Sequence, residues 1–288
     1  MAGIGEALSA ATDALTAVGV EGARFDAEVM LAEVTGKDRT ALIVDPEAAI
    51  PPGDAARRFG EMVRRRLRRE PVAYIVGRKG FCNIELAVDR RVLIPRPETE
   101  LLVELALELR PRTVLDVGTG SGAIALAIAK ELPGCEVTAS DTSAAALEVA
   151  RANAERLGLG GRVRFFEGSV PAGEGFELTV ANLPYVAEAD WPSLRPEVTE
   201  WEPREALLAG ADGLDAIRSF LADHRVRVRG LSRYTGQSAN SVTEILALEI
   251  GQGQAEAVAE LMLTAGFVGI DTRRDLAGIE RLVWGSVD

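Results

Sequence analysis

Residues 113–122 read TVLDVGTGSG, an apolar and β-branched run that ends in a turn with three glycines. Such a run predicts a buried strand, and an alanine-rich helical pattern follows it over 122–131. Glycines let the backbone bend tightly and approach a ligand, while the first turn of the next helix presents free N–H groups. The stretch therefore predicts a strand, a ligand-binding turn and a helix.

The alternation of strands and helices continues beyond this unit. Further strands are expected at 136–141, 163–168, 178–185 and 245–251, further helices at 98–109, 143–157 and 254–265, and two closing strands in FVGIDTRRD and RLVWGSV. Strands that alternate with helices of this length indicate an α/β fold with a parallel, doubly wound sheet.

The first 75 residues have a different, helical pattern. Apolar residues recur three and four positions apart, as at Ile4, Leu8, Ala11, Leu15 and Val18. A further helix is expected over 54–70, and its arginine-rich part, 57–70, is interpreted as a solvated helix face. The alternative is a docking patch for an acidic partner or RNA.

A β-hairpin is expected between the helical and α/β parts. The segment FCNIELAVDRRVLI alternates apolar and polar residues, with Asp89-Arg90 as the candidate turn. We therefore predict a helical domain over 1–75, a β-hairpin linker over 76–95 and an α/β domain over 96–288.

Composition excludes several classes of protein. The 288 residues carry a net charge of −12, which disfavours a protein that mainly grips a nucleic acid backbone. A single histidine, His224, disfavours a serine triad and a histidine-rich metal centre, so no metal site is predicted. Because no apolar run is long enough to span a membrane and no signal peptide is evident, we expect a soluble, cytoplasmic protein.

The predicted turn favours a cationic ligand that contains a ribose. Asp141 ends the next strand, 19 residues after Gly122, where a carboxylate can accept both ribose hydroxyls. The turn carries Asp116 where a phosphate-binding loop would need a lysine, and the acidic group suits a positive charge. S-adenosylmethionine combines a ribose, an ammonium and a sulfonium.

A second chemical signal follows the strand at 178–181, in the segment Asn182-Leu183-Pro184-Tyr185. Open α/β sheets bind substrates at this edge. A planar NH₂ group is a poor nucleophile, so an enzyme that methylates it must accept both N–H hydrogens and hold the nitrogen in line. Asn182 Oδ1 and the Leu183 carbonyl can supply those acceptors, and Tyr185 can stack on a flat group. Alternatively, the segment is simply a loop with a turn-forming proline.

With these motifs the chain resembles the release factor glutamine methyltransferase (PrmC/HemK) family over nearly its whole length. The resemblance rests on EPVAYI (70–75), VLIPRPETE (92–100), DVGTGSGAIALA (116–127), Asp141, NLPY (182–185), EPR (202–204), DGL (212–214), LEIG (248–251) and DLAG (275–278). The IPRPETE segment is the most specific, because generic methyltransferases lack it.

The resemblance implies a Rossmann-like, seven-stranded class I methyltransferase sheet with an antiparallel last strand in the domain over 96–288. It also implies that the small N-terminal helical domain over 1–75 docks the substrate. It implies S-adenosyl-L-methionine as cofactor and N5-methylation of the glutamine in the GGQ motif of class I peptide chain release factors. We further expect a monomer that forms no stable complex with nucleic acid or membrane. The implied cofactor contacts are Gly118, Thr119, Gly120, Ser121, Gly122, Asp141, Val170 and Asn182. The implied substrate contacts are Asn182, Leu183, Pro184 and Tyr185, with Asn182 and Tyr185 catalytic.

The chain departs from the family pattern at three places. Leu183 replaces a proline, Ser169-Val170 replaces an acidic or aromatic pair, and 223–243 is polar and lacks a proline-glycine turn. Two alternative functions remain open at this point. One is an adenine amino-methyltransferase acting on DNA or RNA, and the other is a catalytically impaired methyltransferase-fold docking protein.

Overall fold

The structure is a computed structural model that describes residues 3–51, 53–223 and 244–287. It divides into two compact units. One contains the chain up to Arg78 together with Arg195–Trp201, and the other contains Lys79–Leu194 and the chain from Glu202 onward. Most of the departure expected at 223–243 lies outside the described residues.

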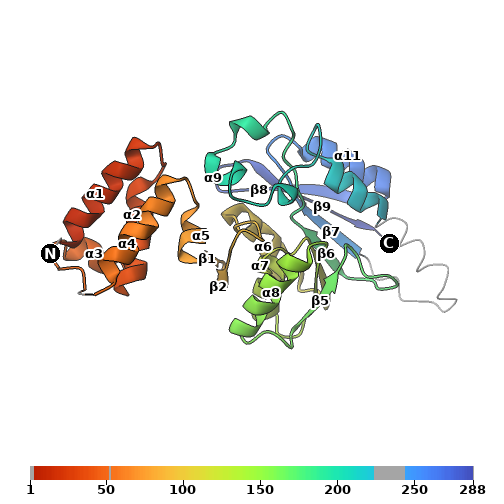
Figure 1. Ribbon diagram of the computed structural model, residues 1–288. Helices are drawn as coiled ribbons and strands as arrows, with labels where there is room; N and C mark the ends of the chain where they lie inside the picture. The colour runs from red at the N-terminus through yellow and green to blue at the C-terminus, as the bar shows by residue number, and fades with distance from the viewer. Residues whose placement is uncertain (1–2, 52, 224–243, 288) are drawn as a thin grey trace. The chain divides into compact units, whose positions relative to one another are not determined.

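The first unit is helical, as Figure 1 shows. Its helices are α1 (Ile4–Ala17), α2 (Ala23–Thr35), α3 (Arg39–Val44), α4 (Ala55–Leu67), α5 (Val72–Val76) and the short α9 (Pro196–Thr199). Ile4, Leu8 and Leu15 are fully buried in its core, as their spacing predicts, whereas Val18 follows the end of α1 and is 43% exposed.

The interpretation of 57–70 as a solvated face is wrong for Arg66. Its side chain is only 6% exposed, and its guanidinium pairs with Asp26 at 2.6 Å and with Glu197 at 2.7 Å. Arg69 binds the other oxygen of Glu197, also at 2.7 Å. An arginine can be buried when carboxylates neutralise it, and here one partner lies 131 residues away along the chain.

The hairpin forms, but its turn is not at Asp89-Arg90. Strands β1 (Arg78–Phe81) and β2 (Ile84–Ala87) pair with each other, and Cys82-Asn83 connects them. Cys82 takes a positive φ of 45°, which is rare for a residue with a side chain but tolerated at a single turn position. Asp89 instead binds the backbone N–H of Arg91 at 3.0 Å, in the loop after β2.

The second unit is built on a seven-stranded sheet with the order β5-β4-β3-β6-β7-β9-β8. Its strands are β3 (Thr113–Val117), β4 (Glu136–Asp141), β5 (Val163–Glu167), β6 (Leu178–Ala181), β7 (Glu244–Glu249), β8 (Val268–Arg274) and β9 (Glu280–Val287). Strand β9 is antiparallel to both of its neighbours, whereas β5, β4, β3, β6 and β7 are parallel. The predicted seven-stranded fold is confirmed.

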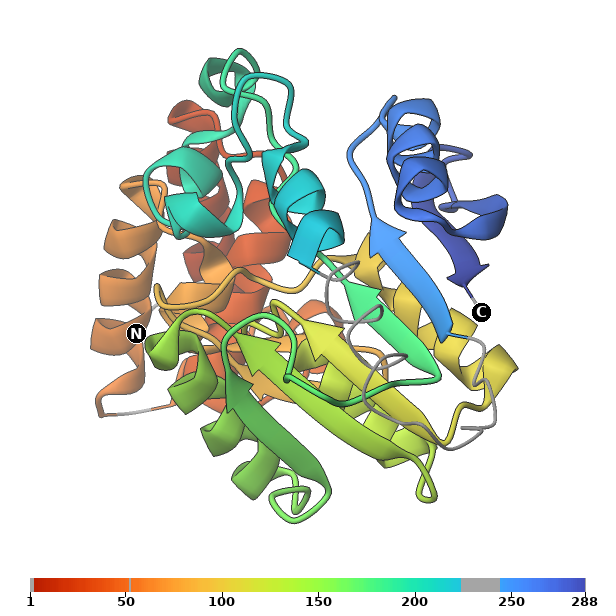
Figure 2. The same cartoon turned by 90° about the vertical axis from the view of Figure 1, so that its right-hand side faces the viewer.

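Helices pack on the sheet and close the core (Figure 2). They are α6 (Glu100–Leu109), α7 (Ala123–Glu131), α8 (Ala144–Arg156), α11 (Ala255–Ala265) and a helical segment at 215–223. Ile217 and Phe220 from the last of these share one apolar core with Val258 and Met262 of α11. Within the described residues, no helix has both the length and the apolar character that crossing a membrane requires.

Strand register sets the level at which the loops leave the sheet. Val117 pairs with Ser140 on one side and with Ala181 on the other, and Ala181 in turn pairs with Leu248. The following residues, Gly118, Asp141, Asn182 and Glu249, therefore lie at one edge of the sheet. This is the carboxyl edge, where parallel α/β sheets bind ligands.

Candidate active site

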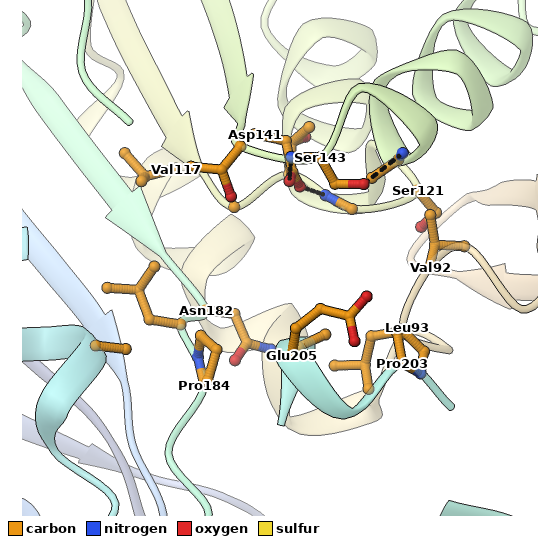
Figure 3. A pocket seen from close by; sticks show the side chains of 18 of the residues that line it. Val92, Leu93, Val117, Ser121, Asp141, Ser143, Asn182, Pro184, Pro203 and Glu205 are labelled. Atoms are coloured by element: carbon orange, nitrogen blue, oxygen red, sulfur yellow. Dashed lines mark hydrogen bonds between the residues drawn. The ribbon is translucent and has the colours of Figure 1, made fainter. Parts of the chain in front are cut away.

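A cavity of about 410 Å³ opens at this carboxyl edge, within the size range of small-molecule sites. Figure 3 shows Asp141 and Ser143 on one side of it and Asn182, Pro184 and Glu205 on the other. The expected site residues that line it are Gly118, Thr119, Gly120, Ser121, Asp141, Asn182, Leu183 and Pro184. The structure thus brings together the glycine turn, the acidic strand end and the NLPY loop. Gly122, Val170 and Tyr185 are not among its lining residues.

The glycines of the turn serve two different purposes. Gly118 and Gly120 line the cavity with φ values of 73° and 55°, which glycine adopts without strain. Gly122 has a φ of 84°, and a Cβ there would lie 2.9 Å from Leu126 Cδ1 and 3.3 Å from Ala150 Cβ. Helix packing beneath the turn therefore requires a glycine at 122, and the ligand contact expected of Gly122 stays a prediction.

Asp116 lies beneath the turn instead of facing a ligand. Its side chain is fully buried, and its Oδ2 accepts hydrogen bonds from Thr119 Oγ1 at 2.7 Å and from the Ala125 N–H at 3.1 Å. Burial raises the pKa of this carboxyl to about 7, although the two hydrogen bonds oppose the shift. Asp116 therefore shapes the turn, and the expectation that it sits beside a cationic ligand is not met.

Asp141 does face the cavity, and backbone donors hold its carboxylate in place. Oδ2 accepts from the Gly120 N–H at 2.9 Å, and Oδ1 accepts from the Ser143 N–H at 2.8 Å. The Ser143 hydroxyl accepts from the Ala146 N–H at 3.2 Å and caps α8. Each carboxylate oxygen has further lone pairs, so the Asp141 side chain can accept two more hydrogen bonds, as the two hydroxyls of a ribose would require.

Asn182 leaves β6 with its amide group anchored. Its Nδ2 donates to Thr99 Oγ1 at 3.1 Å, and Thr99 is only 4% exposed. With the amide nitrogen turned to Thr99, Oδ1 is left to accept a hydrogen bond from a ligand. Thr99 ends the short helix η1 (Pro97–Thr99), so the IPRPETE segment supplies a contact that reasoning on NLPY alone missed.

A buried glutamate fixes the start of that segment. The Glu202 carboxylate accepts from the Ile94 N–H at 3.0 Å and forms an ion pair with Arg96. The EPR and IPRPETE motifs therefore contact and stabilise each other, although they lie more than 100 residues apart in the chain. Glu205, three residues further on, lines the cavity and was also missed. No sequence pattern distinguishes it from an ordinary exposed glutamate.

Two expected site residues lie elsewhere. Val170 packs in the apolar core, and Ser169 lines the cavity from the same turn. The Tyr185 hydroxyl points to Glu249 Oε1 at 3.4 Å, and burial raises its pKa. The proposed adenine contact of Val170 and the stacking role of Tyr185 stay predictions. No cluster of metal-ligating side chains occurs in the parts of the chain that the structure describes.

Comparisons with known proteins cover both units. The family model of the PrmC N-terminal domain matches residues 6–77, and that of the methyltransferase small domain matches residues 97–194. The release factor glutamine methyltransferase of Geobacter sulfurreducens is 41% identical over 274 residues, which cover 93% of this chain and 91% of that protein. Its namesake from Caulobacter vibrioides is 38% identical over 287 residues, 97% of this chain and 95% of that protein.

A solved structure shares the fold at much lower identity. The hMettl16 catalytic domain, in complex with the MAT2A 3′UTR hairpin 6, aligns with a TM-score of 0.50 and 14% identity. The alignment covers 69% of this chain and 75% of that one. At this identity the likeness supports the methyltransferase fold alone.

Proposed function

Since the chain belongs to the release factor glutamine methyltransferase family, we propose that it methylates N5 of the glutamine in the GGQ motif of class I peptide chain release factors. It is an S-adenosylmethionine-dependent methyltransferase. The observation that carries the choice of an amide substrate is the anchored Asn182, whose amide nitrogen binds Thr99 and whose oxygen is left as an acceptor.

The residues of the cavity fit the cofactor. Gly118 and Gly120 allow a close approach to the backbone, and the oriented Asp141 carboxylate would hold the ribose. When bound, S-adenosylmethionine supplies an electrophilic methyl group whose bond to sulfur breaks as the bond to the substrate nitrogen forms.

The protein's task is then to make an amide nitrogen nucleophilic. The lone pair of a primary amide is delocalised into its carbonyl, so the nitrogen attacks poorly in water. Asn182 Oδ1 and the Leu183 carbonyl would accept the two N–H hydrogens and fix the plane of the amide beside the cofactor. The nitrogen loses conjugation as the new bond forms, so it becomes acidic and releases its proton to water. No strong general base is required.

The partner and the setting of the reaction are part of the proposal. A net charge of −12 suits a protein partner better than a nucleic acid backbone. We infer that the enzyme works as a monomer in the cytoplasm and forms no stable complex with DNA or RNA.

The test is to map the methyl group directly. The enzyme is incubated with S-adenosylmethionine and a full-length release factor, and the GGQ peptide is sequenced by tandem mass spectrometry. We expect one added methyl on that glutamine, and none on a release factor with alanine in its place. Transfer to DNA or RNA but not to the release factor would favour the adenine methyltransferase. Cofactor binding without any transfer would favour the docking protein.

A further inference from the structure

Glu249 is a buried carboxyl beside the active site that the proposed reaction does not yet use. It ends β7, and the preceding Leu248 pairs with Ala181, the residue before Asn182. Glu249 is only 2% exposed. Its Oε1 accepts from the Tyr185 hydroxyl at 3.4 Å, and its Oε2 is buried with no donor at hydrogen-bond geometry in the described part of the chain. Burying a carboxylate oxygen without a hydrogen-bond donor costs folding free energy, so a functional reason for it is expected.

The groups that face Glu249 come from three neighbouring segments. Thr99 and Glu98 come from η1, Tyr185 from the loop after β6, and Arg281 from β9, where it also pairs with Asp275 at 3.1 Å. Burial raises the pKa of the Glu249 carboxyl to about 7. The nearby Thr99 hydroxyl is the largest influence that lowers this pKa.

Thr99 therefore stands between Glu249 and Asn182. Its hydroxyl has a single proton. When that proton is donated to an ionised Glu249, the oxygen of Thr99 is left to accept, and it does accept from Asn182 Nδ2 at 3.1 Å. If the Thr99 hydroxyl were free to donate toward Asn182, it could bind either the oxygen or the nitrogen of the amide. Neither orientation of the Asn182 side chain would then be favoured.

We propose that Glu249 is a positioning residue for methyl transfer: its negative charge directs the Thr99 hydroxyl so that Asn182 turns its nitrogen inward and its oxygen to the substrate. This inference deepens the proposed function and rests on it. When Glu249 is protonated, it donates to Thr99, and Thr99 donates to Asn182 Oδ1. The Asn182 amide then flips and presents its NH₂ group to the N–H groups of the substrate, which opposes binding in the reactive orientation.

The first test reads the orientation without any substrate. In ¹⁵N- and ¹³C-labelled full-length protein, the Asn182 side-chain amide signals are assigned by their loss in Asn182→Ala, and the Glu249 carboxyl carbon is followed from pH 5.5 to 8.5. We expect the Asn182 signals to shift with the same midpoint as Glu249, and to stop shifting in Glu249→Gln. Asn182 signals that do not titrate, or that titrate equally in Glu249→Gln, would overturn the proposal. This outcome does not depend on which substrate the enzyme methylates.

The second test is the pH profile of kcat on the release factor. Below the midpoint, wild-type kcat should fall and level off about tenfold below its value at pH 8, because the protonated form is much less competent than the ionised form. Glu249→Gln should have a flat profile, about tenfold below wild type at pH 8 and close to it at pH 6. Its affinity for S-adenosylmethionine should not change. A Glu249→Gln profile parallel to that of wild type would mean that the residue is only structural.

The matched control is Glu244→Gln. Glu244 lies on the same strand, is also buried at 8% exposure, and accepts from the Thr179 hydroxyl at 2.9 Å, but it is at the opposite end of β7. The Glu244→Gln variant removes a comparable buried carboxyl, so it reports the general effect of such a change on kcat and on the Asn182 signals. We expect its kcat profile and its Asn182 signals to keep the wild-type pH dependence. The same changes in Glu244→Gln as in Glu249→Gln would contradict a specific role for Glu249.

Discussion

Asp116 shows how one buried carboxyl can couple the cofactor turn to pH. Its pKa of about 7 in the folded protein lies above the ordinary value of 3.8, so the folded state binds this proton more tightly than the unfolded state. The stability it contributes is present at low pH and is lost as pH rises through 7. The slope is at most roughly 1.4 kcal/mol per pH unit.

Asp116→Asn should remove this dependence. The free energy of unfolding, measured by urea denaturation between pH 5 and 8, should fall with pH less steeply in the variant than in wild type. Asp212→Asn is the control, because the pKa of exposed Asp212 is lowered to about 2 and the residue stays ionised throughout this range. Parallel curves for wild type and Asp116→Asn would show that Asp116 does not titrate there.

At the scale of elements, the loop after β6 carries the family departure at Leu183. A proline there would fix φ near −65° and hold the acceptor carbonyl more rigidly. The leucine keeps the carbonyl but loses this restraint, so Leu183→Pro should raise kcat by about two- to fivefold, the equivalent of roughly 0.4–1 kcal/mol. Steady-state kinetics on the release factor measure this. Unchanged or lower turnover in Leu183→Pro would show that the fixed φ of a proline at this position does not improve catalysis.

Helix α9 supplies a buried ion-pair partner within the helical unit. Glu197 neutralises both Arg66 and Arg69, and its removal leaves a buried guanidinium with one partner fewer. Glu197→Ala should lower the free energy of unfolding by about 3 kcal/mol.

Its control is Glu21→Ala, which removes the exposed pair with Arg195 and should cost less than about 1 kcal/mol. Chemical denaturation monitored by circular dichroism compares the two. Equal losses of unfolding free energy in the two variants would mean that burial does not strengthen the ion pair between Arg66 and Glu197.

The parallel strands of the sheet were predictable from the sequence because they are short segments with apolar and β-branched residues that alternate with helical patterns. The hairpin turn was not, since Cys82 has no residue-type preference for a positive φ, while Asp89-Arg90 resembles an ordinary turn. The burial of Arg66 depends on Glu197, and the roles of Thr99 and Glu249 depend on contacts between distant segments. Local patterns contain no trace of such long-range pairs.

Over the whole molecule, the motifs predicted the α/β sheet, and most of the expected site residues line its cavity. They did not separate residues that line the cavity from residues that packing requires. Gly122 follows the same glycine pattern as Gly118 and Gly120, yet helix packing explains it. Asp116 lies one residue before the end of β3 and Asp141 ends β4, but only Asp141 faces the cavity. Only the fold distinguishes these pairs, because it determines which side of the turn each side chain occupies.

In the proposed reaction, the anchored Asn182 orients the substrate amide and Asp141 holds the cofactor. The measurement is the single-turnover rate of release factor methylation at saturating S-adenosylmethionine, with cofactor affinity determined by calorimetry on the same preparations. We predict that Asn182→Ala lowers the rate by about 10²–10³-fold and leaves cofactor affinity within about twofold, as expected for loss of a hydrogen-bonding group needed for the chemical step. Asp141→Ala should instead weaken cofactor binding at least about tenfold. An Asn182→Ala enzyme that transfers the methyl group at the wild-type rate would contradict the account.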